Sequence, residues 1–108
     1  LYRYEHMLNA FTTPANPGDL PADSLWTESC ALADLDQDGD LDLLLGNYNA
    51  PNCIYLNTGI GVFTDTFGST LGAAVPTYWI AVDDLDGDGD LDIIFADSTL
   101  NLSIYFCQ

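Results

Sequence analysis

The chain has 108 residues, and 48% of them are hydrophobic, which is enough for the core of a single domain. Its formal net charge is −16 and Arg3 is the only lysine or arginine, so it lacks the basic surface that binding to nucleic acid or anionic lipid requires. No apolar run approaches the roughly 20 residues of a membrane-spanning helix, so we expect no membrane insertion.

The N-terminal part predicts one strand followed by a loop. Aromatic and charged side chains alternate weakly from Tyr2 and Arg3 onward, which favours a strand over residues 1–11. Residues 12–24 contain three prolines and a glycine, which predicts a loop.

A first unit of short strands is predicted over about residues 25–67, with Trp26 as a core anchor. Its four expected strands cover residues 25–33, 41–45, 53–57 and 62–67. They are rich in β-branched, aliphatic and aromatic residues, and the segments between them are rich in Gly, Asn, Pro and Asp.

The same plan recurs fifty residues later, in a second unit over about residues 77–107. Its expected strands cover residues 78–82, 91–95 and 102–107. Ile54 and Tyr55 of the first unit align with Ile104 and Tyr105 of the second. The sequence therefore predicts one all-β domain over residues 1–108, built from two antiparallel, propeller-blade-like repeat units and without a convincing helix.

The most distinctive segments are two acidic loops, at residues 34–42 and 84–92, each with five aspartates in nine positions. These carboxylates repel one another, so such a loop folds poorly unless a cation lies among them. Carboxylates at loop positions 1, 3, 5 and 9, a glycine at position 6 and a backbone carbonyl at position 7 make an all-oxygen site that suits Ca²⁺. Mg²⁺ prefers a stricter octahedron, and Zn²⁺ prefers cysteine and histidine ligands that are absent nearby.

The alternative is an acidic, solvated turn without metal, which two copies in the same phase make less favourable. An EF-hand is not expected, because its position-12 glutamate is replaced here by Leu45 and Phe95, within expected strands.

We assign one set of ligands to each of two predicted Ca²⁺ sites. The first set is Asp34, Asp36, Asp38 and Asp42 through their side chains, with Asp40 through its carbonyl. The second set is Asp84, Asp86, Asp88 and Asp92 through their side chains, with Asp90 through its carbonyl. Asp83 stands where the first unit has Ala33, so we expect a surface charge there and not a ligand.

The stretch from Ala33 to Asn47, followed by Ile54-Tyr55-Leu56-Asn57 and Gly61-Val62-Phe63, resembles an FG-GAP/VCBS repeat. Such repeats form the calcium-binding loops of integrin-alpha-like β-propellers, and the resemblance covers about residues 25–67 and 77–107. It implies antiparallel blades in which Ca²⁺ braces a hairpin loop. It also implies adhesion, ligand binding or scaffolding at a cell surface, while some members of the family are lectins and some repeats are attached to enzymes.

Two units are too few for the family's closed ring, which has about four to eight blades. The chain is therefore expected to be a fragment or to complete itself with other copies. The second unit lacks a counterpart of residues 58–64, whereas residues 2–12 resemble residues 55–64. We expect the N-terminal strand of one chain to pair beside the last strand of the next, giving a filament or a ring. The alternative is that this strand covers a sheet of its own chain.

Compartment and modification follow from weaker signals. The absence of lysine and the predicted calcium sites favour an extracellular or cell-surface protein, either processed or part of a longer chain. Of Cys30, Cys53 and Cys107, two could form a disulfide, or all three could be buried thiols. Asn101 begins an Asn-Leu-Ser sequon for N-glycosylation.

Catalysis is not expected, because the acids are concentrated in the loops and His6 is the only histidine. The leading expectation is a secreted, calcium-binding structural or adhesive module that associates with copies of itself or with neighbouring repeats. The second is a carbohydrate-binding, lectin-like module of a larger propeller, which would stack glycans on aromatic rings. Tyr48, in an asparagine-rich turn, is the best candidate, whereas Trp26, Tyr78 and Trp79 are expected in the core.

Overall fold

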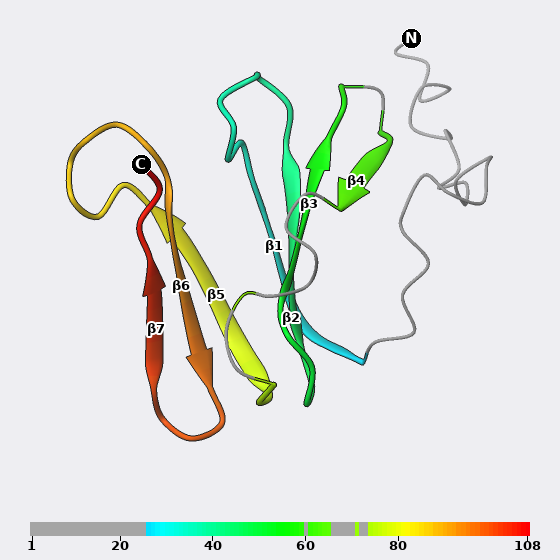
Figure 1. Cartoon of the computed structure of the whole chain (residues 1–108), viewed down its shortest axis with the longest axis vertical. Coiled ribbons are helices and arrows are strands. Elements are labelled where there is room, and N and C mark those ends of the chain that lie inside the picture. Colours follow the sequence, from blue (N-terminus) through cyan, green and yellow to red (C-terminus); the bar gives the residue numbers. More distant parts are fainter. Residues whose placement is uncertain (1–25, 60, 66–70, 72–73) are drawn as a thin grey trace, which may run out of the picture.

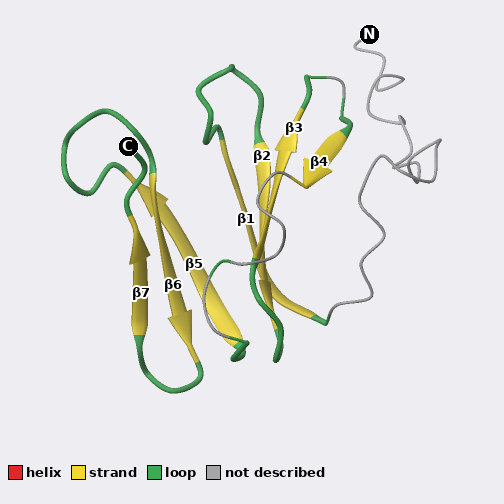
Figure 2. Cartoon of the chain, viewed as in Figure 1, coloured by secondary structure: helices red, strands yellow, loops and turns green. Residues whose placement is uncertain are grey.

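The computed structural model describes residues 26–59, 61–65, 71 and 74–108 (Figure 1). Within them the chain forms seven β-strands in two antiparallel sheets, with no helix (Figure 2). The predicted all-β fold of two antiparallel, blade-like units is confirmed. The strand predicted over residues 1–11 and the loop at residues 12–24 lie outside the described residues.

Each repeat unit forms its own sheet, with the strands in sequence order. The first sheet has the order β1-β2-β3-β4 and contains β1 (Thr27–Ala33), β2 (Asp42–Asn47), β3 (Cys53–Asn57) and β4 (Phe63–Asp65). The second has the order β5-β6-β7 and contains β5 (Thr77–Asp83), β6 (Asp92–Asp97) and β7 (Leu102–Tyr105). In the described part of the chain, β7 therefore has one strand neighbour, whereas β3 has two.

The two sheets have the same pairing register. Leu43 pairs with Tyr55 in the first sheet, and Ile93 pairs with Tyr105 in the second. Even the irregularity recurs, since the β1–β2 register shifts between Thr27 and Ser29 and the β5–β6 register between Thr77 and Trp79. Because side chains alternate between the faces of a strand, this shared register gives corresponding residues the same face of each sheet.

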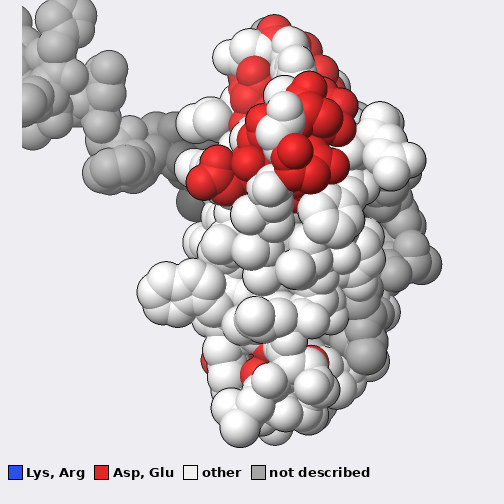
Figure 3. Space-filling view, turned by 90° about the vertical axis from the view of Figure 1, so that its left-hand side faces the viewer, with Lys and Arg blue, Asp and Glu red and all other residues white. Residues whose placement is uncertain are grey.

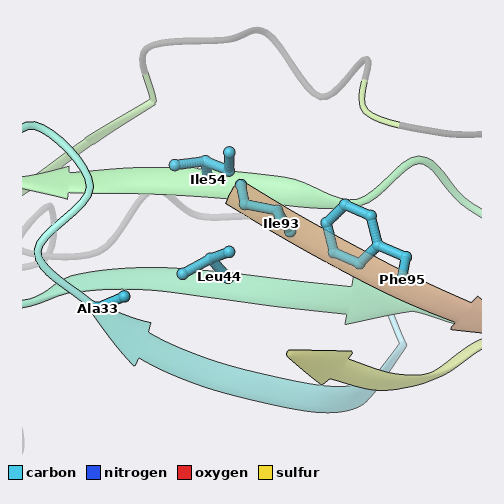
Figure 4. Packing of buried hydrophobic residues seen from close by; sticks show 5 residues of the cluster. All are labelled: Ala33, Leu44, Ile54, Ile93 and Phe95. Atoms are coloured by element: carbon cyan, nitrogen blue, oxygen red, sulfur yellow. The ribbon is translucent and has the colours of Figure 1, made fainter. Parts of the chain in front are cut away.

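The core lies between the two sheets. Ala33, Leu44 and Ile54 of the first sheet pack with Ile93 and Phe95 of the second (Figure 4). Leu44 is fully buried, and burial of such a side chain stabilises the folded state by about 1.5–3 kcal/mol. The strands β1 and β5 lie side by side, so the inner strands of the two units join them into one body.

The expected positions of several aromatic residues are wrong. Trp26 is 70% exposed and lies before β1, at the end of the sheet, with its ring centroid 5.4 Å from that of Tyr48. Tyr78 and Trp79 are also exposed, so these rings are not core anchors. The physical reason is that the core contains only the facing sides of the two sheets, whereas Trp26 lies before β1 and Trp79 lies on the other side of the second sheet.

The cysteines are free thiols, and no disulfide joins them. Cys53 is buried, but Cys30 and Cys107 are exposed, so the alternative of three buried thiols holds for Cys53 alone. With no helix in the described part of the chain, none there is long and apolar enough to cross a membrane.

Candidate metal centres

The acidic loops connect β1 to β2 and β5 to β6, and in each loop a glycine permits the sharp turn. Gly39 and Gly89, at loop position 6, have φ angles of +98° and +99°, which L side chains rarely adopt. Aspartates shape the rest of each turn, because Asp38 Oδ1 accepts the backbone N–H of Asp40 at 2.9 Å. Asp88 Oδ1 accepts the N–H of Asp90 at the same distance. These bonds fold the chain back so that carboxylates converge.

Each loop brings three carboxylates together. In the first loop, Asp34, Asp36 and Asp42 each have an oxygen within 4.8 Å of the other two. In the second loop, the converging set is Asp84, Asp86 and Asp88. All of these were assigned as ligands from the sequence, and three carboxylates at such separations offer a divalent cation a hard, all-oxygen environment. Four other assigned residues lie outside these two groups, namely Asp38, Asp40, Asp90 and Asp92.

The carboxylate of Asp34 provides a test of whether a cation fits. Its Oδ2 accepts the N–H of Gly39 at 3.0 Å, while its Oδ1 is buried and has no hydrogen-bond partner. In the second loop the equivalent Asp84 has both oxygens bonded, to the N–H groups of Gly87 and Gly89. A buried oxygen without a partner is costly, and a cation would relieve that cost. The residues of the first loop therefore fit a Ca²⁺ ion.

The last aspartate of each loop also has a structural role. Asp42 is fully buried, and its oxygens accept the N–H groups of Leu35 at 2.7 Å and Asn57 at 2.9 Å. Asp92 is equally buried and accepts from Leu85 at 2.7 Å and Cys107 at 3.0 Å. Each carboxylate thus ties the start of its loop to the last residue of β3 or, in the second unit, to the residues that follow β7.

Sequence reasoning missed this role of Asp42 and Asp92. The available signal is position, because each is the loop acid next to an apolar strand and lies where a side chain becomes buried. The two backbone donors of Asp42 are 7 residues before it and 15 residues after it, so the chain pattern alone does not reveal them.

One aspartate in each loop has a raised pKa. Loss of hydration and repulsion from Asp38 and Asp42 raise the pKa of Asp36, against the opposing effect of the Asp38 N–H. At Asp86 the N–H of Asp88 acts to lower the pKa, but loss of hydration and repulsion from neighbouring acids outweigh it and leave the pKa raised. A divalent cation would remove this repulsion.

The two loops lie side by side at one end of the molecule. Gln37 of the first loop donates through Nε2 to Asp90 Oδ1 at 2.5 Å and to the Gly89 carbonyl at 3.4 Å in the second loop. Figure 3 shows acidic side chains gathered at this end of the view, with no lysine or arginine coloured among the described residues. Each predicted site therefore lies in the electrostatic field of the other.

Three further sequence assignments can now be placed. Asp83 is exposed, and its Oδ1 accepts the N–H of Asp84 at 2.9 Å, which leaves it outside the converging carboxylates. Asn101 is exposed in the β6–β7 turn, where its Nδ2 donates to Thr99 Oγ1 at 2.7 Å. Tyr48 is 40% exposed.

Comparison with known proteins gives one match. The family model described as an FG-GAP-like repeat matches residues 34–95, from the first aspartate of the first loop to Phe95 of β6. No curated protein and no solved structure matches the chain. The matched stretch contains both acidic loops and the strands that connect them, which are the features that carried the resemblance in the sequence. The chain belongs to the FG-GAP-like repeat family, whose repeats form modules of the β-propeller type.

Proposed function

We propose that the chain is a secreted, calcium-binding structural or adhesive module in which Ca²⁺ braces each acidic hairpin loop. The observation that carries the proposal is the convergence of Asp34, Asp36 and Asp42 around the unpartnered Oδ1 of Asp34. Bound Ca²⁺ would supply positive charge and no chemical reaction, so the proposed role is not enzymatic. In the second loop, Asp84, Asp86 and Asp88 would hold the ion.

The assigned residues outside these groups would complete the two shells. Asp38 and Asp92 would add carboxylate oxygens at loop positions 5 and 9, and Asp40 and Asp90 would add the carbonyls at loop position 7. Because Ca²⁺ takes six to eight oxygen ligands, three carboxylates alone leave its shell incomplete.

An extracellular or surface location supports the use of Ca²⁺. FG-GAP-like repeats are typical of extracellular or surface proteins. Outside cells Ca²⁺ is abundant, so sites of only moderate affinity are filled there. The exposed Asn101 makes N-glycosylation in a secretory route a further part of the proposal. Loss of mass after enzymatic deglycosylation of native material would test that part.

Calorimetric titration of chelator-treated protein tests the calcium proposal. We expect two Ca²⁺ ions per chain and a higher melting temperature in Ca²⁺ than in EDTA, because an ion that binds only the folded state stabilises it. Asp36→Asn and Asp86→Asn should each remove or weaken one site. The matched control is Glu28→Gln, which makes the same charge change at an exposed position on β1. Unchanged melting with chelator would refute the proposal.

The proposed self-association uses the free edge of β7. The first sheet continues from β3 to β4, whereas β7 pairs only with β6 among the described residues. An apolar cavity of about 390 Å³ lies between the sheets, lined by Ile54 and Leu56 of β3 and, at the end of β7, by Tyr105, Phe106 and Cys107. We propose that the N-terminal strand of another copy, residues 1–11, pairs with this edge and places an apolar side chain in the cavity. Repeated head to tail, this contact would build a filament.

Removal of residues 1–11 tests the strand-pairing proposal. Full-length protein in millimolar Ca²⁺ should form polymers visible by electron microscopy, and the shortened chain should not. Adding the peptide of residues 1–11 in excess should cap the polymers and shorten them. A shortened chain that polymerises as well as the full chain would rule out strand pairing.

Carbohydrate binding is the second candidate, and the exposed pair of Trp26 and Tyr48 favours it. Their ring centroids are 5.4 Å apart and their planes are tilted by 42°, so two neighbouring π-faces are presented near the start of β1. Aromatic faces of this kind stack on sugar rings. A glycan array would identify a ligand, and Tyr48→Ala should abolish the signal.

A further inference from the structure

The interface between the two sheets is built from two different faces. The first sheet contributes the row Ala31, Leu44 and Ile54, whose members are paired across β1, β2 and β3. The second sheet contributes the rows of Ile80 with Phe95, and of Val82 with Ile93. The faces meet head to tail, because the first unit uses one side of its sheet and the second unit uses the opposite side.

Because the two sheets share one register, the side of the second sheet that faces away from the first corresponds to the side that the first sheet buries in the interface. Fifty residues beyond Ala31, Leu44 and Ile54 lie Ala81, Ile94 and Ile104, and these are paired in the same way. Together with Trp79 and Leu102, they form what we name the trailing face. Ile104 is 47% exposed, Leu102 67% and Trp79 70%, so the face is an exposed apolar surface.

The side of the first sheet that faces away from the second corresponds to the side that the second sheet buries in the interface. Cys30, Leu32, Leu43 and Leu45 correspond by the same shift to Ile80, Val82, Ile93 and Phe95. We name these four residues the leading face. Leu32 is 60% exposed, Cys30 is exposed, and Leu43 and Leu45 are half-buried. Tyr55 on β3 is already buried, so the leading face is confined to β1 and β2.

We infer that the trailing face of one copy docks on the leading face of a second copy, as the two sheets dock within one chain. The partner is a second copy because each face repeats one half of an interface that the chain already forms. Trp79 and Ala96 stand where the internal interface has Ser29 and Gly46. A Cβ at Gly46 would lie 2.9 Å from Thr77 Cγ2, so the two copies must pack further apart at that end of the contact than the two sheets of one chain do. The contact joins unlike faces, so a pair of docked copies still has one free leading face and one free trailing face for further copies.

This docking deepens the proposed self-association and rests on the proposed calcium sites. The copy whose leading face docks is also the copy whose residues 1–11 pair with β7, so the two parts form one contact and loss of either should leave the chain monomeric. Within the chain, Gln37 bridges the two acidic loops by its bond to Asp90. Between copies, the corresponding residue is Gly87, which has no side chain to make that bond. Two acidic loops would therefore meet without a bridge, and we expect docking in Ca²⁺ but not in EDTA.

Two variants and their mixture test the inference by sedimentation velocity in Ca²⁺. Ile104→Asp blocks the trailing face and Leu32→Asp blocks the leading face, at positions already exposed in the single chain. Each variant alone should remain monomeric. Their equimolar mixture should reach twice the monomer mass and stop there, because only one compatible pair of faces remains. Leu100→Asp is the matched control and should associate like the unmodified chain, since Leu100 is 95% exposed in the β6–β7 turn.

Each contrary result has a separate meaning. If calorimetry shows bound Ca²⁺ but the unmodified chain stays monomeric at all concentrations, the docking inference is wrong and the calcium proposal stands. If both single variants associate like the unmodified chain, or their mixture forms no dimer, the faces are not the interface. If Ca²⁺ does not bind, the calcium proposal fails, and docking that persists in EDTA overturns the calcium dependence inferred here. Circular dichroism of each variant shows whether it is folded, and Ile104→Thr and Leu32→Thr replace a variant that is not.

Discussion

At the scale of single residues, the acidic loops contain two kinds of aspartate. Asp42 and Asp92 are fully buried and accept two backbone hydrogen bonds each, whereas Asp34 keeps a buried oxygen without a partner. The first kind stabilises the fold whether or not an ion is present. The second kind destabilises the folded state when no ion is bound. Because Asp42 and Asp92 are also assigned as Ca²⁺ ligands, measurements in EDTA are needed to separate the structural effect of substituting them from the effect on metal binding.

Asp92→Asn should destabilise the protein even in EDTA. An amide presents an N–H₂ group to one of the two backbone donors, Leu85 N or Cys107 N, and leaves that donor unpaired. A buried unsatisfied group costs about 1–3 kcal/mol, so the free energy of unfolding should fall by that amount in urea denaturation. Glu28→Gln, which removes the same charge from an exposed position, should change it little. Equal stability of the two variants would show that the Asp92 contacts contribute nothing.

Asp97 provides a pH-dependent prediction outside the metal loops. Hydrogen bonds from the hydroxyl and N–H of Thr99, with a further one from the Asn101 N–H, lower the pKa of Asp97 below its usual value of 3.8. A lowered pKa in the folded state contributes stability above pH 3.8, and that contribution is lost as pH falls through the lower value. Thr99→Val should raise the pKa of Asp97 in an NMR titration. An unchanged titration curve would contradict the role of the hydroxyl.

At the scale of elements, most strands of the two sheets could be predicted from the sequence, for a physical reason. Alternating or continuous apolar runs, bounded by acidic loops and turns, define each strand wherever one face is buried. β3 begins and ends as predicted, and the predicted second strand of each unit is displaced by one or two residues at its ends. Among the described residues β7 pairs only with β6, because none of them forms a counterpart of β4 in the second sheet.

The positions of the aromatic rings could not be obtained in this way. Trp26 and Trp79 have the hydrophobicity of core residues, and the pattern assigns them to strands. Whether a side of a sheet is covered depends on the other sheet, which lies far away in sequence. The second sheet covers the Leu44 side of the first and leaves Trp79 on its own opposite side, 70% exposed. The candidate site shows the same limit, because the pattern identifies the acids but does not reveal which of them are buried.

Gln37 connects the two loops and yields a prediction at this scale. Gln37→Glu keeps the size and the backbone preference of the side chain but replaces the donor to Asp90 with a second carboxylate. One exposed hydrogen bond becomes a repulsive pair, so unfolding in EDTA should become easier by about 0.5–1 kcal/mol. Saturating Ca²⁺ should reduce this difference. A variant as stable as the unmodified chain in EDTA would show that the loops are independent.

At the scale of the whole molecule, the two repeat units share one core and neither sheet has a core of its own. The cluster of Leu44, Ile54, Ile93 and Phe95 takes side chains from both sheets, and β1 lies beside β5 (Figures 1 and 4). A small domain has a total stability of about 5–15 kcal/mol, so loss of this interface would remove much of it. We therefore expect the described sheets to unfold together.

Leu44→Ala tests whether the units are one cooperative body. Leu44 is fully buried on β2, and removing a buried leucine side chain costs about 2–5 kcal/mol, partly through the cavity that remains. If the sheets unfold as one, hydrogen-exchange protection should fall by the same free energy in β6 as in β2, although the substitution lies in the first sheet. Leu100→Ala makes the same chemical change at a side chain that is 95% exposed and should leave both strands protected. Loss of protection confined to β1–β4 would mean that each unit holds its own structure. In that case the interface between the sheets would contribute little, and docking of further copies through the same kind of face would lose its physical basis.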